Sequence, residues 1–137
     1  MSQENVEIVR GVYEAVARGD TRAVLAAYDP EVEWEFSGSP FRNMCKQVVY
    51  RGHDDIRSFI RERYEEAWEN IEDHLDELID AGEQVISVIT TQGRGLASGA
   101  EVAQTHAGVW TIREGKIVRV AWVGSRDEAL EATGLRD

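Results

Sequence analysis

The second half of the chain contains three long β-type runs in close succession, and this order limits the folds open to it. The runs cover residues 85–91, 102–112 and 117–123, with short turns between them, and helical segments come first. Helices followed by a long antiparallel meander are typical of an α+β domain. The sequence therefore predicts a curved antiparallel sheet wrapped on three N-terminal helices. Such a cone-shaped barrel has an open end, which favours a small-molecule pocket.

Apolar spacing and turn residues place the other elements. Helices are predicted over residues 3–17, from Asp20 to about residue 28, and from Asp54 or Asp55 along a stripe that reaches Trp68. Ser2 is expected to cap the first helix and Pro30 to end the second. The remaining predicted elements are strands at 32–36 and 71–79, a loop at 37–52, and a short C-terminal helix at 127–132.

Length and cysteine content indicate one domain, residues 1–137, that needs no disulfide. The single cysteine, Cys45, cannot form an internal bridge, so a reducing cytoplasm is the expected location. The polar, acidic N-terminus does not resemble a signal peptide. No apolar run approaches the roughly 20 residues of a membrane span.

The charge balance argues against two classes of partner, nucleic acid and membrane. The chain has 26 acidic and 15 basic residues, a formal net charge of -11. Phosphate backbones and anionic membrane surfaces would repel such a chain, so neither nucleic acid nor membrane is an expected partner. The simplest role of the charge is solubility.

Four segments resemble the SnoaL-like branch of the nuclear transport factor 2-like superfamily, which is kin to polyketide cyclases and ketosteroid isomerases. They are residues 12–20, 50–56, 109–117 and 126–130, so the resemblance covers almost the whole chain. It implies the cone-shaped fold, a single SnoaL-like domain and a homodimer. It says less about function, because this fold carries isomerases, cyclases, epoxide hydrolases, dehydratases and non-catalytic domains.

The catalytic residues of ketosteroid isomerases do not carry over. The resemblance places Phe36 where those enzymes have their aspartate base, and Val12, with Tyr13 beside it, where they have a tyrosine. Their second acid falls near Ala107 or Gly108. SnoaL-like cyclases resemble this chain in using an acid–base group on a late strand.

His106 is the candidate catalytic residue on that basis. An imidazole exchanges protons near neutral pH, and strand alternation places His106, Gly108, Trp110 and Ile112 on one face. A core or surface histidine with a satisfied hydrogen bond remains the alternative.

Aromatic side chains form the candidate ligand-binding set. Tyrosine hydroxyls can polarise a ligand carbonyl, and indole walls suit a flat apolar ligand, although each residue suits a packed core equally well. The set is Tyr13, Trp34, Tyr64, Trp68, Trp110 and Trp122.

Asp73 and Glu77 share a predicted strand face with Ile71, Leu75 and Ile79. An inward face would bury a carboxylate with a perturbed pKa. The imperfect alternation instead favours a solvated edge strand.

Metal and cofactor signals are missing from the sequence. His53, His74 and His106 are far apart in the sequence, and no phosphate-binding glycine loop opens a helix, so no metal and no cofactor are expected.

Three functions remain open. The first is a cofactor-free enzyme that moves protons on a small apolar ligand by isomerase, cyclase, dehydratase or hydrolase chemistry. The others are a non-catalytic ligand-binding module and a dimerisation domain, with Arg119, Ala121 and Val123 as the outer row of the pairing face.

Overall fold

The computed structural model describes residues 2–135, and the side chains of Ser2, Tyr64, Glu65 and Ala67 lie outside that description. Three helices precede the long meander and a fourth follows it, as predicted. The helices are α1 (Ser2–Arg18), α2 (Thr21–Ala26), α3 (Gly52–Arg61) and α4 (Arg126–Thr133), with a 3-10 turn η1 (Arg42–Met44) and a π-helical turn η2 (Glu62–Ala67) that continues α3.

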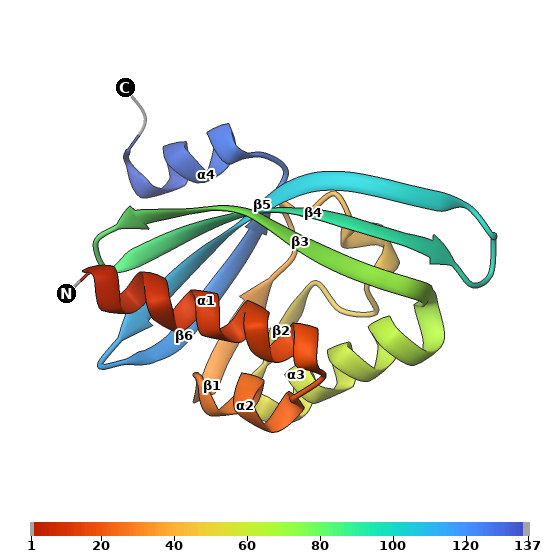
Figure 1. Cartoon of the computed structure of the whole chain (residues 1–137), viewed down its shortest axis with the longest axis horizontal. Coiled ribbons are helices and arrows are strands. Elements are labelled where there is room, and N and C mark those ends of the chain that lie inside the picture. Colours follow the sequence, from red (N-terminus) through yellow and green to blue (C-terminus); the bar gives the residue numbers. More distant parts are fainter. Residues whose placement is uncertain (1, 136–137) are drawn as a thin grey trace.

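One six-stranded sheet holds the molecule together, in the order β2-β1-β6-β5-β4-β3. Neighbours are antiparallel except β1 and β6, which run parallel. After edge strand β2, α3 carries the chain across to the opposite edge, and the meander returns to place β6 beside β1 (Figure 1). The strands are β1 (Tyr28–Glu35), β2 (Val49–Arg51), β3 (Trp68–Ala81), β4 (Gln84–Gly95), β5 (Glu101–Arg113) and β6 (Lys116–Val123).

The helices divide between the two faces of this curved sheet. In Figure 1, α1 crosses one side of the strands and α4 lies on the other. The valine stripe of α1 is buried in the main core, together with inward side chains of β1, β4, β5 and β6. The predicted α+β arrangement with a curved sheet around the first helices is confirmed, with the parallel β1–β6 pair as the difference.

The predicted ends of two elements were wrong. Asp20 does cap α2 through Ala23, but the helix ends at Ala26, and Tyr28 already pairs with Ile117. Pro30 therefore lies inside β1. It falls where the register with β6 is interrupted, and there a residue without an N–H removes no ladder hydrogen bond.

Two further boundaries also differ from the prediction. Trp68 begins β3 and does not end the third helix. The loop predicted over residues 37–52 contains η1 and the short edge strand β2, which pairs with β1.

Two irregularities in β3 explain its imperfect alternation. The register with β4 shifts between Glu69 and Glu72, where Asn70 has a φ of 55°, and again between Leu75 and Glu77. Each bulge adds a residue and changes which face the following side chains occupy. The second bulge therefore separates Leu75, which packs on the inner core, from Ile79, which packs on the outer cluster.

The outer face of the sheet is partly covered by α4. Ala129 is buried against Ile86, Val88, Ala107 and Val109 from β4 and β5. On β6, Ala121 and Val123 pack against this cluster. A register shift opposite Thr111 and Ile112 makes Ile117 the inward residue at the start of β6.

We expect Gly108→Ala to destabilise the protein. A Cβ atom at Gly108 would lie 2.8 Å from Trp122 Cζ3, 3.0 Å from Trp110 Nε1 and 3.1 Å from Ser87 Oγ. Overpacking of this kind costs about 1–3 kcal/mol. Urea unfolding measures it. The control is Gly11→Ala on the exposed side of α1, where nothing lies within 4 Å and helix propensity predicts a gain of up to about 1 kcal/mol. Equal stabilities of the two variants would contradict the expectation.

Candidate functional site

A cavity lies between the inner face of the sheet and α1 and α3, with the segment of residues 36–45 on its remaining side. The volume of this cavity is about 110 Å³. Its lining is mostly aromatic and aliphatic, and three charged side chains and one histidine lie among it: Glu62, Arg63, Asp73 and His106. The protein is therefore hollow where a small molecule could bind.

The sequence-predicted residues meet at this cavity. Six of the seven line it, from four strands and α1, and the side chain of Tyr64 lies outside the described residues. The six are Tyr13, Trp34, Trp68, His106, Trp110 and Trp122.

Edge-to-face aromatic contacts build the wall. Trp34 lies at its centre, with ring centroids 5.1 Å from Phe59, 5.6 Å from Trp122 and 5.8 Å from Tyr28, all T-shaped. Trp110 and Trp122 pack in the same way at 5.6 Å. Rings in this arrangement are favourably oriented and stabilise the wall beyond the area that they bury.

A chain of hydrogen bonds crosses three neighbouring strands at the cavity wall. Arg63 Nη2 on η2 lies 2.6 Å from Asp73 Oδ1 on β3. The Thr91 hydroxyl on β4 donates to the same oxygen at 2.6 Å. Thr91 Oγ1 also lies 2.9 Å from Nε2 of His106 on β5. Four side chains from four elements thus form one polar unit in an otherwise apolar site.

Asp73 is buried, so the expected solvated strand was wrong at this residue. Only 8% of its side chain is exposed. Burial alone would raise the pKa of Asp73, but the charge of Arg63 and the hydrogen bonds from Arg63 and Thr91 outweigh it and lower the pKa below its ordinary value. Glu77, beyond the second bulge, is partly exposed and pairs with Arg126. The segment is a strand, as predicted, and its alternation is interrupted only where the two bulges occur.

The ionised carboxylate fixes the tautomer of His106. Because Thr91 gives its hydrogen to Asp73, its oxygen must accept from Nε2–H of His106. Nδ1 then carries the lone pair, and this buried atom has no hydrogen-bond partner among the described residues. Burial lowers the pKa of His106 to about 4, against the opposing effect of Asp73, and Arg63 lowers it further. The imidazole is therefore neutral at physiological pH.

Two indole nitrogens in the wall, those of Trp34 and Trp122, are also buried and have no partner within the described part of the chain. The Trp34 N–H lies close enough to the Tyr28 hydroxyl to oppose the burial-driven rise of the tyrosine pKa, although the two form no hydrogen bond of good geometry. Trp122 Nε1–H is thus the clearer unsatisfied donor.

Tyr13 belongs to a second, satisfied network. Trp110 Nε1 donates to Ser87 Oγ at 2.8 Å, and the Tyr13 hydroxyl lies 2.9 Å from the same oxygen. Burial raises the pKa of Tyr13 above its ordinary value, so the phenol stays protonated. Its hydroxyl can act as a hydrogen-bond donor or acceptor, but it is no base at neutral pH.

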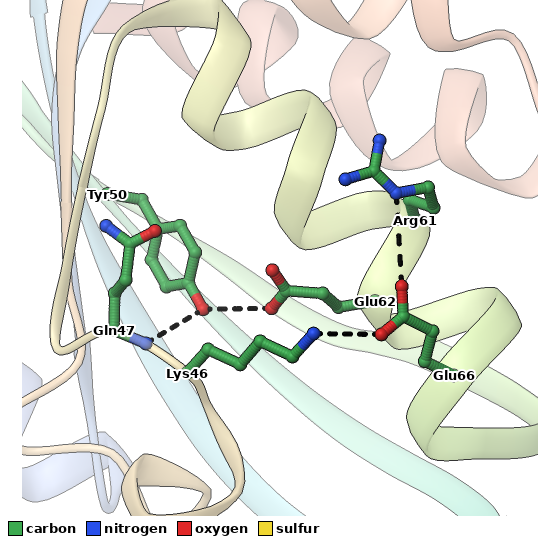
Figure 2. A network of polar contacts seen from close by, with 6 residues as sticks. All are labelled: Lys46, Gln47, Tyr50, Arg61, Glu62 and Glu66. Carbon is green, nitrogen blue, oxygen red and sulfur yellow. Dashed lines mark hydrogen bonds and ion pairs between the residues drawn. The ribbon is translucent and has the colours of Figure 1, made fainter.

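Polar contacts tie the segment beside the cavity to η2, as Figure 2 shows. Lys46 Nζ lies 2.9 Å from Glu66 Oε1, and the Tyr50 hydroxyl donates to Glu62 Oε1 at 3.2 Å. The backbone N–H of Gln47 donates to the Tyr50 hydroxyl. These contacts hold residues 46–50 against the helix from which Glu62 and Arg63 enter the lining.

Two other candidate residues, Cys45 and His53, are less suited to catalysis. Burial raises the pKa of the Cys45 thiol to about 11, so it is protonated and a poor nucleophile at neutral pH. His53 Nε2 lies 3.0 Å from the Tyr28 carbonyl oxygen, and this contact ties the start of α3 to β1. Among the described residues, no three His, Cys, Asp or Glu side chains are grouped to hold a metal ion.

Sequence reasoning missed Thr91 and Arg63. The run Val85, Ser87, Ile89, Thr91 alternates toward the inner face, which could have placed Thr91 beside His106. Arg63 had no comparable signal, because it follows α3 on a π-helical turn. Phe36, which the resemblance places where ketosteroid isomerases have an aspartate, lines the cavity as an apolar ring.

The chain belongs to the SnoaL-like domain family, whose profile matches residues 9–120. The resemblance predicted from the sequence is thereby confirmed. No curated protein matches the sequence closely enough to lend it a function. No helix in the described part of the chain is both long and apolar enough to cross a bilayer.

Solved structures support the same assignment. An NTF2-like protein from Burkholderia thailandensis is 32% identical, with 96% of this chain and 97% of that one covered and a TM-score of 0.76. An NTF2-like protein of unknown function from Burkholderia pseudomallei is 26% identical, with 93% and 95% covered and a TM-score of 0.77. TerC, crystallised with polyporic acid, shares the fold at 21% identity, with 96% and 98% covered and a TM-score of 0.77.

The lowered pKa of His106 predicts a pH-dependent stability. Between about pH 6.5 and about pH 4 the unfolded chain binds a proton at this residue and the folded chain does not, so acid favours unfolding. The contribution lost over that window is up to about 3 kcal/mol. Urea unfolding of the wild type and of His106→Gln at several pH values measures it. Parallel stability curves for the two proteins would contradict a low pKa.

Proposed function

We propose that this protein is a cofactor-free enzyme that moves a proton on a small, largely apolar ligand, with His106 as the catalytic residue. The observation that carries the proposal is the buried Nδ1 lone pair of His106 in the wall of a cavity. Burial keeps the imidazole neutral, and Thr91 and Asp73 orient it. Tyr13, Trp34, Trp68, Trp110 and Trp122 contact the ligand, and Tyr64 is proposed with them.

The proton transfer follows from this geometry. Nδ1 accepts a proton from the ligand, the N–H bond forms as the ligand bond to hydrogen breaks, and the electron pair stays on the ligand. The imidazolium that results is stabilised through Thr91 by the Asp73 carboxylate, and it returns the proton to another ligand atom. Such acid–base groups typically contribute about 10²–10⁴-fold to a rate. Isomerase, cyclase, dehydratase and hydrolase reactions all contain a step of this type.

The alternative is a module that binds a ligand without converting it. Its support is the mostly apolar lining and a His106 pKa of about 4, which makes the imidazole a weak base. TerC, which shares the fold, was crystallised with polyporic acid, and this supports a small ligand under either function. The two functions differ only in whether a hydrogen on the bound molecule is exchanged.

Hydrogen exchange in a simple ketone separates them. We expect the protein to accelerate exchange of the hydrogens beside the carbonyl of 1-tetralone in D₂O, measured by proton NMR. His106→Gln keeps a polar side chain of similar size but cannot accept the proton, so the protein-catalysed rate should fall by about 10²–10⁴-fold. Binding of the ketone should change only a few-fold.

Adjacent threonines provide a matched control. Thr91→Val removes the link between His106 and Asp73 and should lower the exchange rate. Thr90→Val removes a hydroxyl that bonds Asp76 and Thr105 on the outer side, and should leave the rate unchanged. Exchange no faster than in solution, or equally fast in His106→Gln, would favour the binding module.

We also propose that the protein works as a homodimer in the cytoplasm. The outer row of β6 supports pairing, because Ala121 and Val123 are only half-buried beside α4, and Arg119 is the exposed charge of that row. Closed two-fold pairs are the commonest homo-oligomers. Sedimentation of the wild type should give twice the chain mass, and Ala121→Glu should shift it toward the monomer. A monomer mass for the wild type at tens of micromolar would exclude the pairing.

A further inference from the structure

Residues 37–47 form a compact loop whose two ends are held together. The backbone N–H of Phe36 donates to the Val48 carbonyl oxygen at 2.8 Å, beside the pairing of β2 with β1. Within the loop, the N–H of Met44 donates to the Phe41 carbonyl oxygen, so η1 gives the middle of the loop a structure of its own. A loop of this length that is closed at its base is an Ω-loop, a type that is frequently functional.

The inward side of this loop forms one wall of the cavity. Phe41, Met44 and Cys45 all line the cavity. The ring centroid of Phe41 lies 6.1 Å from that of Trp68 and 5.1 Å from that of His106, edge-on to both. Met44 is 51% exposed, whereas the four lining tryptophans are at most 8% exposed. The cavity therefore meets solvent beside this loop, and a molecule that enters there must pass the loop.

An exposed ion pair joins the loop to the opposite rim of the cavity. Lys46 Nζ lies 2.9 Å from Glu66 Oε1 on η2, and Arg61 lies 3.9 Å from the other oxygen of Glu66 (Figure 2). The Lys46 and Glu66 side chains remain 65% and 47% exposed. Exposed ion pairs stabilise a structure weakly, so this contact can break and form again readily. The loop thus has a firm base and a weak contact at the cavity rim, as a moving cover requires.

We propose that the 37–47 loop is a gate that opens and closes the cavity, with the Lys46–Glu66 ion pair as its latch. The structure shows the closed form, in which Phe41 packs against Trp68 and His106. When the latch breaks, the loop turns about its paired ends, uncovers the aromatic wall and admits a ligand. This gate goes beyond the proposed function, because it serves catalysis and binding alike and its test needs neither a ligand nor turnover.

The chain has one cysteine, and its position makes it a reporter of the gate. Cys45 lies on the gate, its thiol contacts the Phe41 carbonyl oxygen, and burial raises its pKa to about 11, so the closed form protects it. The experiment follows modification of the thiol by N-ethylmaleimide, a small neutral reagent, with mass spectrometry. Each rate is divided by the rate for the same variant unfolded in urea, and this ratio is the fraction of molecules that expose the thiol. We expect the wild-type ratio to exceed the globally unfolded fraction, known from urea titration, by about tenfold or more.

Variants of the latch change this ratio in a defined way. Glu66→Gln should raise it about two- to fivefold, the range for a surface ion pair. Lys46→Gln should raise it by the same factor, and the double variant no further, because either change alone breaks the pair. Glu77→Gln is the matched control, because it breaks an ion pair of equal length and similar exposure, Arg126–Glu77, which holds α4 on the other side of the sheet. The ratio should not change in this control.

A second control separates gating from unfolding. Ala129→Gly weakens α4 on the outer face, so it destabilises the whole fold from the side of the sheet opposite the gate. If the gate exposes the thiol, the ratio is unchanged in this variant. Three outcomes would overturn the gate: a ratio that rises in Ala129→Gly in step with the unfolded fraction, a wild-type ratio that the unfolded fraction explains, or equal ratios in Glu66→Gln and the wild type.

Discussion

The geometry of the site depends on one buried carboxylate. Asp73 stays ionised because Arg63 and Thr91 both contact its Oδ1 at 2.6 Å. An ionised carboxylate only accepts hydrogen bonds, so the Thr91 hydrogen must point toward it. Thr91 then accepts from His106, and the lone pair of the imidazole is left on Nδ1. Asp73 therefore sets the orientation of His106, the candidate catalytic residue, through the hydroxyl of Thr91.

That carboxylate reaches the cavity because β3 is irregular. In a regular strand, side chains alternate, so Trp68 on the inner face would place Asp73 on the outer face. The bulge at Asn70 adds one residue and brings Ile71 and Asp73 inward after Trp68. A bulge costs ladder pairing, but it re-aims the side chains that follow. Here it converts a solvent-facing acid into a cavity-lining one, and the second bulge returns Glu77 to the surface.

Regular features of the fold were predictable from the sequence, and irregular ones were not. The stripe of α1 and the shared face of His106, Gly108 and Trp110 follow from simple periodicity, and the structure has both. The turn at Glu114 and Gly115 has positive φ at both residues, as a tight hairpin requires. The position of a bulge depends instead on tertiary pairing. For this reason the inward position of Asp73 was hidden, although that of His106 was not.

Burial determines which acid–base chemistry His106 can perform. The aromatic wall that creates the cavity also lowers the pKa of His106 to about 4, and this weakens it as a base. An imidazolium with so low a pKa gives its proton back readily, and a water-poor wall offers few acceptors other than the ligand. The arrangement therefore suits a reaction in which a proton leaves one ligand atom and returns to another. It suits less well a reaction that must release the proton to solvent before the next step. Isomerisation and intramolecular ring closure belong to the first kind, and the buried Nδ1 is consistent with them.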